Sequence, residues 1–179
     1  MSEQLDAVDA IAAQWRRERP DLDSSPMTVI GRITRLAALL ERELDGVFAR
    51  YGLAGCDFDV LATLRRSGAP YRLTPTELSR STMVTTGGMT KRLDRLEESG
   101  WIRREPDPRD RRGKLIALTD EGRELVDRAV EGHLVNEERL LASIPRADRK
   151  QLAALLRGLL LAVDEPTDES AVAPPSKTM

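Results

Sequence analysis

The chain has 179 residues and a hydrophobic content of 40%, which suits one buried core with appendages. It contains one cysteine and one histidine, which excludes a disulfide framework and a zinc site of Cys and His ligands within one chain. No apolar run approaches the roughly 18 residues that cross a bilayer, and the acidic amino terminus is unlike a signal peptide. We therefore expect a soluble, cytoplasmic protein with no membrane partner.

Positive charge is concentrated in one segment of the chain. The net charge is −2, yet residues 80–114 hold ten basic and six acidic side chains, so this segment carries +4 and the remainder −6. A phosphate backbone responds to local charge, and such segregation is typical of a nucleic-acid footprint on an acidic body.

The amino-terminal part is expected to be helical. Apolar residues at helical spacing predict an amphipathic helix over residues 3–19, ended by Pro20, and a long helix over residues 27–51, ended by Gly52. A short helix over residues 56–67 follows. We expect residues 1–25 to form a separate helix and linker, and residues 26–55 to take part in dimerisation.

A strong local signal for a helix start lies at Thr74. Glu77 stands three residues later and Pro75 occupies the first helical position, which together make a capping box. Leu73 and Leu78 can pack together across this start as a hydrophobic staple.

The next helix and the strands after it complete a winged helix-turn-helix over residues 56–118. A helix is expected over residues 85–99, followed by antiparallel strands at 101–104 and 114–118. The loop between the strands, residues 106–113, is rich in Pro and Arg and forms the wing. This geometry presents a helix to the major groove and cations to the flanking phosphates or the minor groove.

Two further long helices, over residues 120–142 and 145–163, carry more apolar surface than a small wing domain covers. Residues 119–163 are therefore expected to join residues 26–55 in a homodimer that binds a pseudo-palindromic operator of double-stranded DNA. Residues 164–179 are acidic and then rich in Pro, Ser and Thr, which predicts disorder. The predicted fold class is mostly α with a small β-wing.

Outward-facing side chains of the reading helix and the wing are the candidate DNA contacts. The helix is expected to contribute Thr85, Thr86, Thr90 and Lys91 to base edges or phosphates, and the wing Arg109, Arg111 and Arg112 to phosphates and the narrow groove. Gly87 and Gly88 are unusual near a helix start, and either close approach to DNA or close packing on the preceding helix would explain them.

The wing resembles that of the multiple antibiotic resistance regulator (MarR) family of bacterial repressors. Asp110, Arg112, Ile116, Leu118 and Thr119 stand at the family's spacing of D-x-R-x-x-x-(V/I)-x-L-T. The resemblance covers residues 27–163. It implies a dimeric repressor in which Arg112 enters the minor groove, Asp110 supports the wing, and a small molecule releases the protein from DNA.

Four further residues resemble the signature of a subgroup with an extra first helix that responds to urate or related purines: Trp15, Asp59, Arg92 and Arg104. An indole to stack on and guanidinium groups suit a planar anion, and an Asp59–Arg92 link could transmit binding to the reading helix. Phenolic acids or other aromatic anions would use the same groups. The four residues could also be only structural.

Other functions have less support. Cys56 could act as a redox sensor, but its sequence neighbours Asp57 and Asp59 are acidic, whereas a reactive thiol needs a positive charge nearby. The chain has no Gly-rich phosphate loop, nucleophile elbow or metal-spaced cluster, so neither an enzyme nor a cofactor is expected. A protein-interaction module that does not bind DNA is a weaker alternative, because the wing is positive.

Overall fold

The computed structural model describes residues 5–82 and 88–164, without the side chains of Arg111 and Arg112. The predicted contacts Thr85 and Thr86, and the predicted disorder of residues 165–179, lie outside that description. The chain divides into two compact units, residues 1–136 and 137–179.

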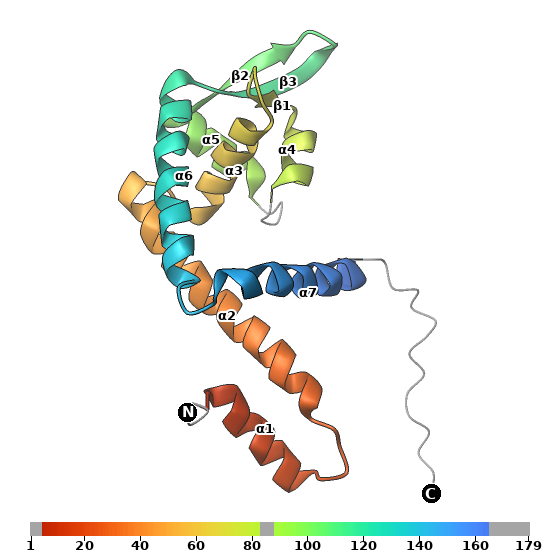
Figure 1. Cartoon of the computed structure of the whole chain (residues 1–179). Helices are drawn as coiled ribbons and strands as arrows, with labels where there is room; N and C mark the ends of the chain where they lie inside the picture. The colour runs from red at the N-terminus through yellow and green to blue at the C-terminus, as the bar shows by residue number, and fades with distance from the viewer. Residues whose placement is uncertain (1–4, 83–87, 165–179) are drawn as a thin grey trace, which may run out of the picture. The chain divides into compact units, whose positions relative to one another are not determined.

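The described elements follow the predicted order (Figure 1). They are α1 (Ala7–Glu18), α2 (Ser25–Phe48), the 3-10 turn η1 (Ala49–Tyr51), α3 (Gly55–Arg66), β1 (Arg72–Leu73), α4 (Pro75–Ser81), α5 (Met89–Glu98), β2 (Ile102–Asp107), β3 (Asp110–Leu118), α6 (Asp120–Leu140) and α7 (Arg146–Asp164). The fold is mostly helical with one small sheet.

Helices α1 and α2 form an antiparallel hairpin. Asp6 caps α1 by accepting the amide hydrogen of Val8 at 2.7 Å, which satisfies a donor that the helix leaves unpaired. Arg32 of α2 donates to Asp6 at 2.8 Å and to Asp9 at 2.7 Å. A Cβ at Gly31 would lie 3.2 Å from Val8, so the two helix backbones approach closely at this point.

The capping box at Thr74 is confirmed. The hydroxyl of Thr74 accepts the amide hydrogen of Glu77 at 3.2 Å, and the carboxylate of Glu77 accepts the amide hydrogen of Thr74 at 2.8 Å. Pro75 occupies the first helical position. Gly52 also takes the left-handed conformation predicted at the end of the long helix, with φ +70°.

The sheet is larger than the sequence predicts. Its order is β1-β3-β2, all antiparallel, and the short strand β1 is absent from the sequence-based prediction. The predicted wing loop over residues 106–113 is wrong in extent, because β2 continues to Asp107 and β3 begins at Asp110. Proline and arginine are compatible with this strand pair because the ladder is irregular at Pro106 and Asp107. The hairpin of β2 and β3 projects beyond the helices (Figure 1).

One hydrophobic core joins α3, α4, α5, the sheet and the first half of α6. Its fully buried side chains include Leu61, Leu64, Leu78, Leu96 and Ile116. Burial of a leucine or isoleucine side chain contributes roughly 1.5–3 kcal/mol, so this core supplies the main stabilisation of the reading unit.

Helix α6 begins where Thr119 accepts the amide hydrogen of Gly122 at 2.9 Å. The hydroxyl of Thr119 also donates to the carbonyl of Gly100 at 2.7 Å, which ties this helix start to the turn that precedes β2. Helix α7 belongs to the second unit and, taken alone, buries none of its residues. No helix within the described ranges is both long and apolar enough to cross a bilayer.

Gly122 is expected to be essential for the junction of α6 with the sheet. A Cβ at this position would lie 2.0 Å from the carbonyl oxygen of Trp101. Gly122→Ala should therefore lower the free energy of unfolding by about 1–3 kcal/mol. Urea denaturation at one protein concentration measures this. Gly46→Ala is the matched control, because Gly46 lies within α2 with nothing within 4 Å of its added Cβ; equal losses in both variants would contradict the assignment.

Candidate nucleic-acid interface

Helix α5 has one buried and one exposed face. Met89, Leu93 and Leu96 are buried in the core, while Thr90 and Lys91 are exposed. This confirms the predicted inward residues and leaves the two described candidate contacts of the helix accessible to a partner.

The helix begins later than predicted. Gly88 has φ +81°, a left-handed conformation outside the helical region, and α5 starts at the next residue, Met89. A Cβ at Gly88 would meet no atom of the described residues within 4 Å, so close packing on α4 is not the reason for glycine. Glycine stands here because the left-handed backbone strains other residues.

An ion pair connects α5 to the start of α3. Arg95 donates to the buried carboxylate of Asp57 at 2.5 Å, and this hydrogen bond raises the pKa of Arg95. The guanidinium also lies beside the thiol of Cys56, which contributes to the same shift in pKa. The fold therefore gives Cys56 a positive neighbour that its sequence context does not indicate.

A second set of ion pairs connects α5 to the wing. Arg104 of β2 donates to Asp94 at 2.6 Å and also pairs with Glu97. The hydrogen bond to Asp94 is the largest cause of the raised pKa of Arg104. The amide hydrogen of Arg104 is accepted by Glu97 at 3.0 Å. Arg104 thus holds the first wing strand against the reading helix, a role that local sequence does not reveal.

Arg66 of α3 positions the end of α4. Its guanidinium donates to the carbonyl of Ser81, one of the acceptors that a helix leaves unpaired at its carboxyl end. The same guanidinium lies 3.9 Å from the buried carboxylate of Asp59. Asp59 therefore forms an ion pair with Arg66, and the predicted Asp59–Arg92 ion pair does not occur among the described residues.

The tip of the wing is organised by Asp107. Its carboxylate accepts the amide hydrogen of Arg109, two residues on, at 2.9 Å, and pairs with the Arg109 guanidinium at 3.3 Å. The amide hydrogen bond, followed by the side-chain bond, lowers the pKa of Asp107. Asp–Pro–Arg is a recognisable signal for such an Asx-turn, which the sequence analysis missed. Support of the wing by Asp110 stays a prediction. Asp110 is the backbone pairing partner of Asp107.

Some basic side chains of the reading unit form ion pairs with carboxylates of the same chain, and others do not. Arg109 is 71% exposed but paired with Asp107. Among the residues that the structure describes, three exposed cations of the reading unit make no ion pair: Arg80 of α4, Lys91 of α5 and Lys114 of β3. Phosphates are the ligands that such uncompensated cations favour.

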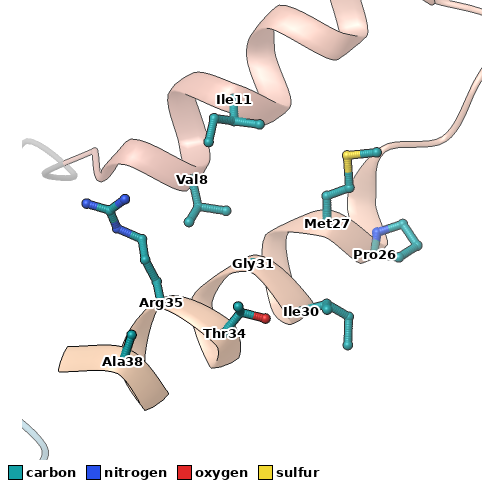
Figure 2. A pocket seen from close by; sticks show the side chains of 9 residues that line it. All are labelled: Val8, Ile11, Pro26, Met27, Ile30, Gly31, Thr34, Arg35 and Ala38. Atoms are coloured by element: carbon teal, nitrogen blue, oxygen red, sulfur yellow. The ribbon is translucent and has the colours of Figure 1, made fainter. Parts of the chain in front are cut away.

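The four predicted effector residues lie on four different elements, α1, α3, α5 and β2. Trp15 lies on α1 and is 44% exposed, whereas Arg92 lies on α5 with a buried Nη1 atom that has no hydrogen-bond partner in the described part of the chain. A hollow of about 760 Å³ lies between α1 and α2, lined mostly by apolar residues such as Val8, Ile11 and Met27 (Figure 2). It contains none of the four predicted residues.

The architecture is that of a winged helix-turn-helix, a DNA-binding class of protein. It consists of helix α4, helix α5 with its exposed face, and the basic hairpin of β2 and β3. Comparison with known proteins agrees. The MarR family model matches residues 51–113. The transcriptional regulator PecS of Dickeya dadantii is 48% identical over 149 residues, 83% of this chain and 90% of that protein.

Solved structures give the same result. Sco3205 of Streptomyces coelicolor, a MarR family regulator in complex with DNA, has a TM-score of 0.72 and 29% identity over 82% of this chain and 96% of its own. A mutant of MarR from E. coli, complexed with operator DNA, has a TM-score of 0.65 and 25% identity over 82% of this chain and 97% of its own. The chain belongs to the MarR family: it is a DNA-binding transcriptional regulator and not an enzyme.

Replacement of Asp107 should separate its two contributions to the wing. Asp107→Asn keeps an acceptor for the Arg109 amide and loses only the charge, whereas Asp107→Ala loses both. We expect amide hydrogen exchange at Arg109, followed by NMR, to quicken strongly in the alanine variant and only slightly in the asparagine variant. Equal exchange in wild type and Asp107→Ala would contradict the Asx-turn assignment.

Proposed function

We propose that this regulator is a homodimeric repressor that binds a pseudo-palindromic operator and is released from it by a small aromatic anion such as urate. The observation that carries the DNA part is the set of exposed cations on the reading unit that have no ion pair among the described residues, Arg80, Lys91 and Lys114. Such a protein acts on the chromosome, so we place it in the cytoplasm.

The different DNA contacts expected of α5 and of the wing follow from the positions of their side chains. Thr90 and Lys91 lie on the exposed face of α5, which is the face that enters the major groove in this type of fold. Lys114 lies on the wing strand β3. The wing hairpin also carries Arg109, Arg111 and Arg112, and Thr85 and Thr86 precede α5. Contacts from the helix carry sequence preference, and those from the wing are more tolerant of sequence.

Exposed apolar side chains support the dimer. On α2, Val29, Ile30 and Leu36 are each more than half exposed, and on α7 Leu155 and Leu160 are each 66% exposed. Exposed apolar surface of this kind, present on each of the two units, favours an interface. A second copy would cover it, and a twofold dimer would place two reading helices at half-sites about 10 base pairs apart.

The effector assignment rests on Trp15, Asp59, Arg92 and Arg104. Support comes from Arg92, because a buried guanidinium nitrogen without a hydrogen-bond partner in the described part of the chain favours an anionic ligand. Arg92 is part of α5, so a ligand that binds it displaces or reorients the reading helix. Urate and phenolic acids share the planar, anionic chemistry, and titration of each identifies the ligand.

Redox control through Cys56 is a second candidate, favoured by the Arg95 guanidinium beside the thiol. Treatment of the wild type and of Cys56→Ser with peroxide decides this point. Loss of DNA binding in the wild type alone would support the redox mechanism, and an unchanged wild type would exclude it.

Lys91 and Arg112 are expected to contact DNA phosphates or the groove. Each alanine variant should weaken operator binding and reduce the slope of log affinity against log salt by about 0.9, the value for one neutralised phosphate. Fluorescence anisotropy in a salt series from about 50 to about 200 mM measures both quantities. Lys150→Ala is the control, since Lys150 is an exposed lysine of α7 outside the reading unit. Unchanged slopes in both test variants would contradict the interface.

Arg92→Gln should abolish the response to urate. Calorimetry is expected to show binding of urate to the wild type, and urate should release the wild type from its operator. The variant should bind at least about tenfold more weakly, because it lacks the charge that pairs with the ligand. Absence of heat and of release in the wild type would exclude urate, and an unaltered response of Arg92→Gln would exclude the site.

A further inference from the structure

The carboxyl end of α4 is held by hydrogen bonds from two sides. A helix leaves the carbonyl groups of its last turn without partners inside the helix. In α4, Thr82 supplies two of the missing donors: its amide bonds to the carbonyl of Leu78 at 3.0 Å, and its hydroxyl bonds to that of Ser79 at 3.3 Å. The donor to the carbonyl of Ser81 comes from a different helix, from Arg66 at the end of α3. A helix of 7 residues has little stability of its own, so this link from α3 helps to fix where α4 ends.

One guanidinium joins this carbonyl to a buried carboxylate. Nη2 of Arg66 donates to the carbonyl of Ser81, while Nη1 lies 3.9 Å from Oδ1 of Asp59. Asp59 and Arg66 are about two turns apart on α3, so their side chains lie on the same face of that helix. Arginine offers several N–H groups in a rigid planar fork, which suits it to two acceptors that lie in different directions.

Asp59 is the rigid end of this chain of contacts. Its side chain is 11% exposed, whereas that of Arg66 is 50% exposed. The backbone carbonyl of Asp59 accepts the hydroxyl hydrogen of Thr63 at 2.7 Å, and the next residues, Val60 and Leu61, are fully buried in the core. Support therefore runs from the core through Asp59 to Arg66, and from Arg66 to the end of α4.

The end of α4 determines where two parts of the DNA interface lie. Its last turn carries Leu78, which is buried in the core, and Arg80, an exposed cation without an ion pair among the described residues. Beyond Thr82 the chain leads to the reading helix α5, which begins at Met89. A change in the direction of this end therefore moves Arg80 relative to the core, and it also moves the point from which the chain continues to α5.

We propose that Asp59 and Arg66 are a positioning pair for DNA binding: held by Asp59, Arg66 fixes the end of α4 in the arrangement that DNA recognises. The pair acts through Arg80 and through the start of the connection to α5, and neither member contacts DNA itself. The inference goes beyond the proposed function, in which Asp59 belongs to the effector site. It concerns the protein without effector, so it is independent of the identity of the ligand.

A direct phosphate contact by Arg66 predicts the opposite result at Asp59. If the half-exposed guanidinium contacted a phosphate, Asp59 would compete with DNA for it, and removal of the carboxylate charge would strengthen binding. In a positioning pair the same change weakens binding, because Arg66 loses the anchor that holds it at Ser81. Asp59→Asn keeps the size of the side chain and removes its charge, so the sign of its effect separates the two roles.

Operator binding without effector is the first measurement, by fluorescence anisotropy in a salt series from about 50 to about 200 mM. Asp59→Asn and Arg66→Gln should each weaken binding roughly five- to thirtyfold, because DNA must then order about one residue at the end of α4. The slope of log affinity against log salt should stay within about 0.3 of the wild-type value, because the number of neutralised phosphates is unchanged. The double variant should bind as weakly as either single variant, since the two residues act as one unit.

The neighbouring ion pair of α3 provides a matched control. Arg65 donates to Asp127 at 2.7 Å and so connects α3 to α6 instead of α4. Arg65→Gln and Asp127→Asn change the net charge in the same way as the test variants, and both should bind the operator within about twofold of the wild type. A slope reduced by about 0.9 in Arg66→Gln would assign Arg66 to a phosphate and overturn the proposal. Tighter or unchanged binding by Asp59→Asn would also overturn it.

Limited trypsin digestion tests the position of α4 without DNA. The tryptic bond between Arg80 and Ser81 adjoins the carbonyl that Arg66 holds. Both test variants should be cut at this bond faster than the wild type, because a freed helix end opens more often, and mass spectrometry of the fragments measures the rate. The two control variants should be cut at the wild-type rate. Equal rates in all of these proteins would overturn the positioning role. Arg66→Gln, at a half-exposed position, carries both tests if Asp59→Asn does not fold.

Discussion

The attachment of helix α5 to the rest of the reading unit is the constraint on which the structure depends. Its apolar face is buried in the core through Leu93 and Leu96, and its polar edges are tied by Arg95 to α3 and by Arg104 to the wing. The apolar contacts supply most of the energy, and the ion pairs orient the helix, because solvent screens pairs in which one partner is half exposed, as Arg95 and Asp94 are. The helix is thus held from two sides.

The arginines of the basic segment consequently serve different purposes. Arg95, Arg104 and Arg109 are engaged with carboxylates of the same chain, whereas Lys91 and Lys114 carry charge without an ion pair among the described residues. A local excess of positive charge remains after pairing, and it lies on the face and wing that the fold presents. Composition therefore indicates nucleic-acid binding correctly, although it overstates the number of cations available to DNA.

The long helix α2 links α1 to the reading unit. It has 24 residues, α1 packs along its amino-terminal part, and apolar side chains remain exposed on it from Met27 to Leu40.

The sequence by itself determined the features that depend on neighbours a few residues apart. The capping box of Thr74 and Glu77, the left-handed Gly52 and the inward side of α5 are predictable because each follows from local hydrogen bonding or helical periodicity. Asp107 could also have been identified, since its carboxylate bonds to the amide only two residues further along the chain.

Only the tertiary structure decided which charges meet. Arg104 pairs with Asp94 across ten residues, and Asp59 forms an ion pair with Arg66, while none joins it to Arg92 among the described residues. Strand β1 exists because β3, which lies beyond two intervening helices and β2 in the sequence, offers it a hydrogen-bonding partner. Such pairings depend on where the packed core places each backbone, and no local pattern carries that information.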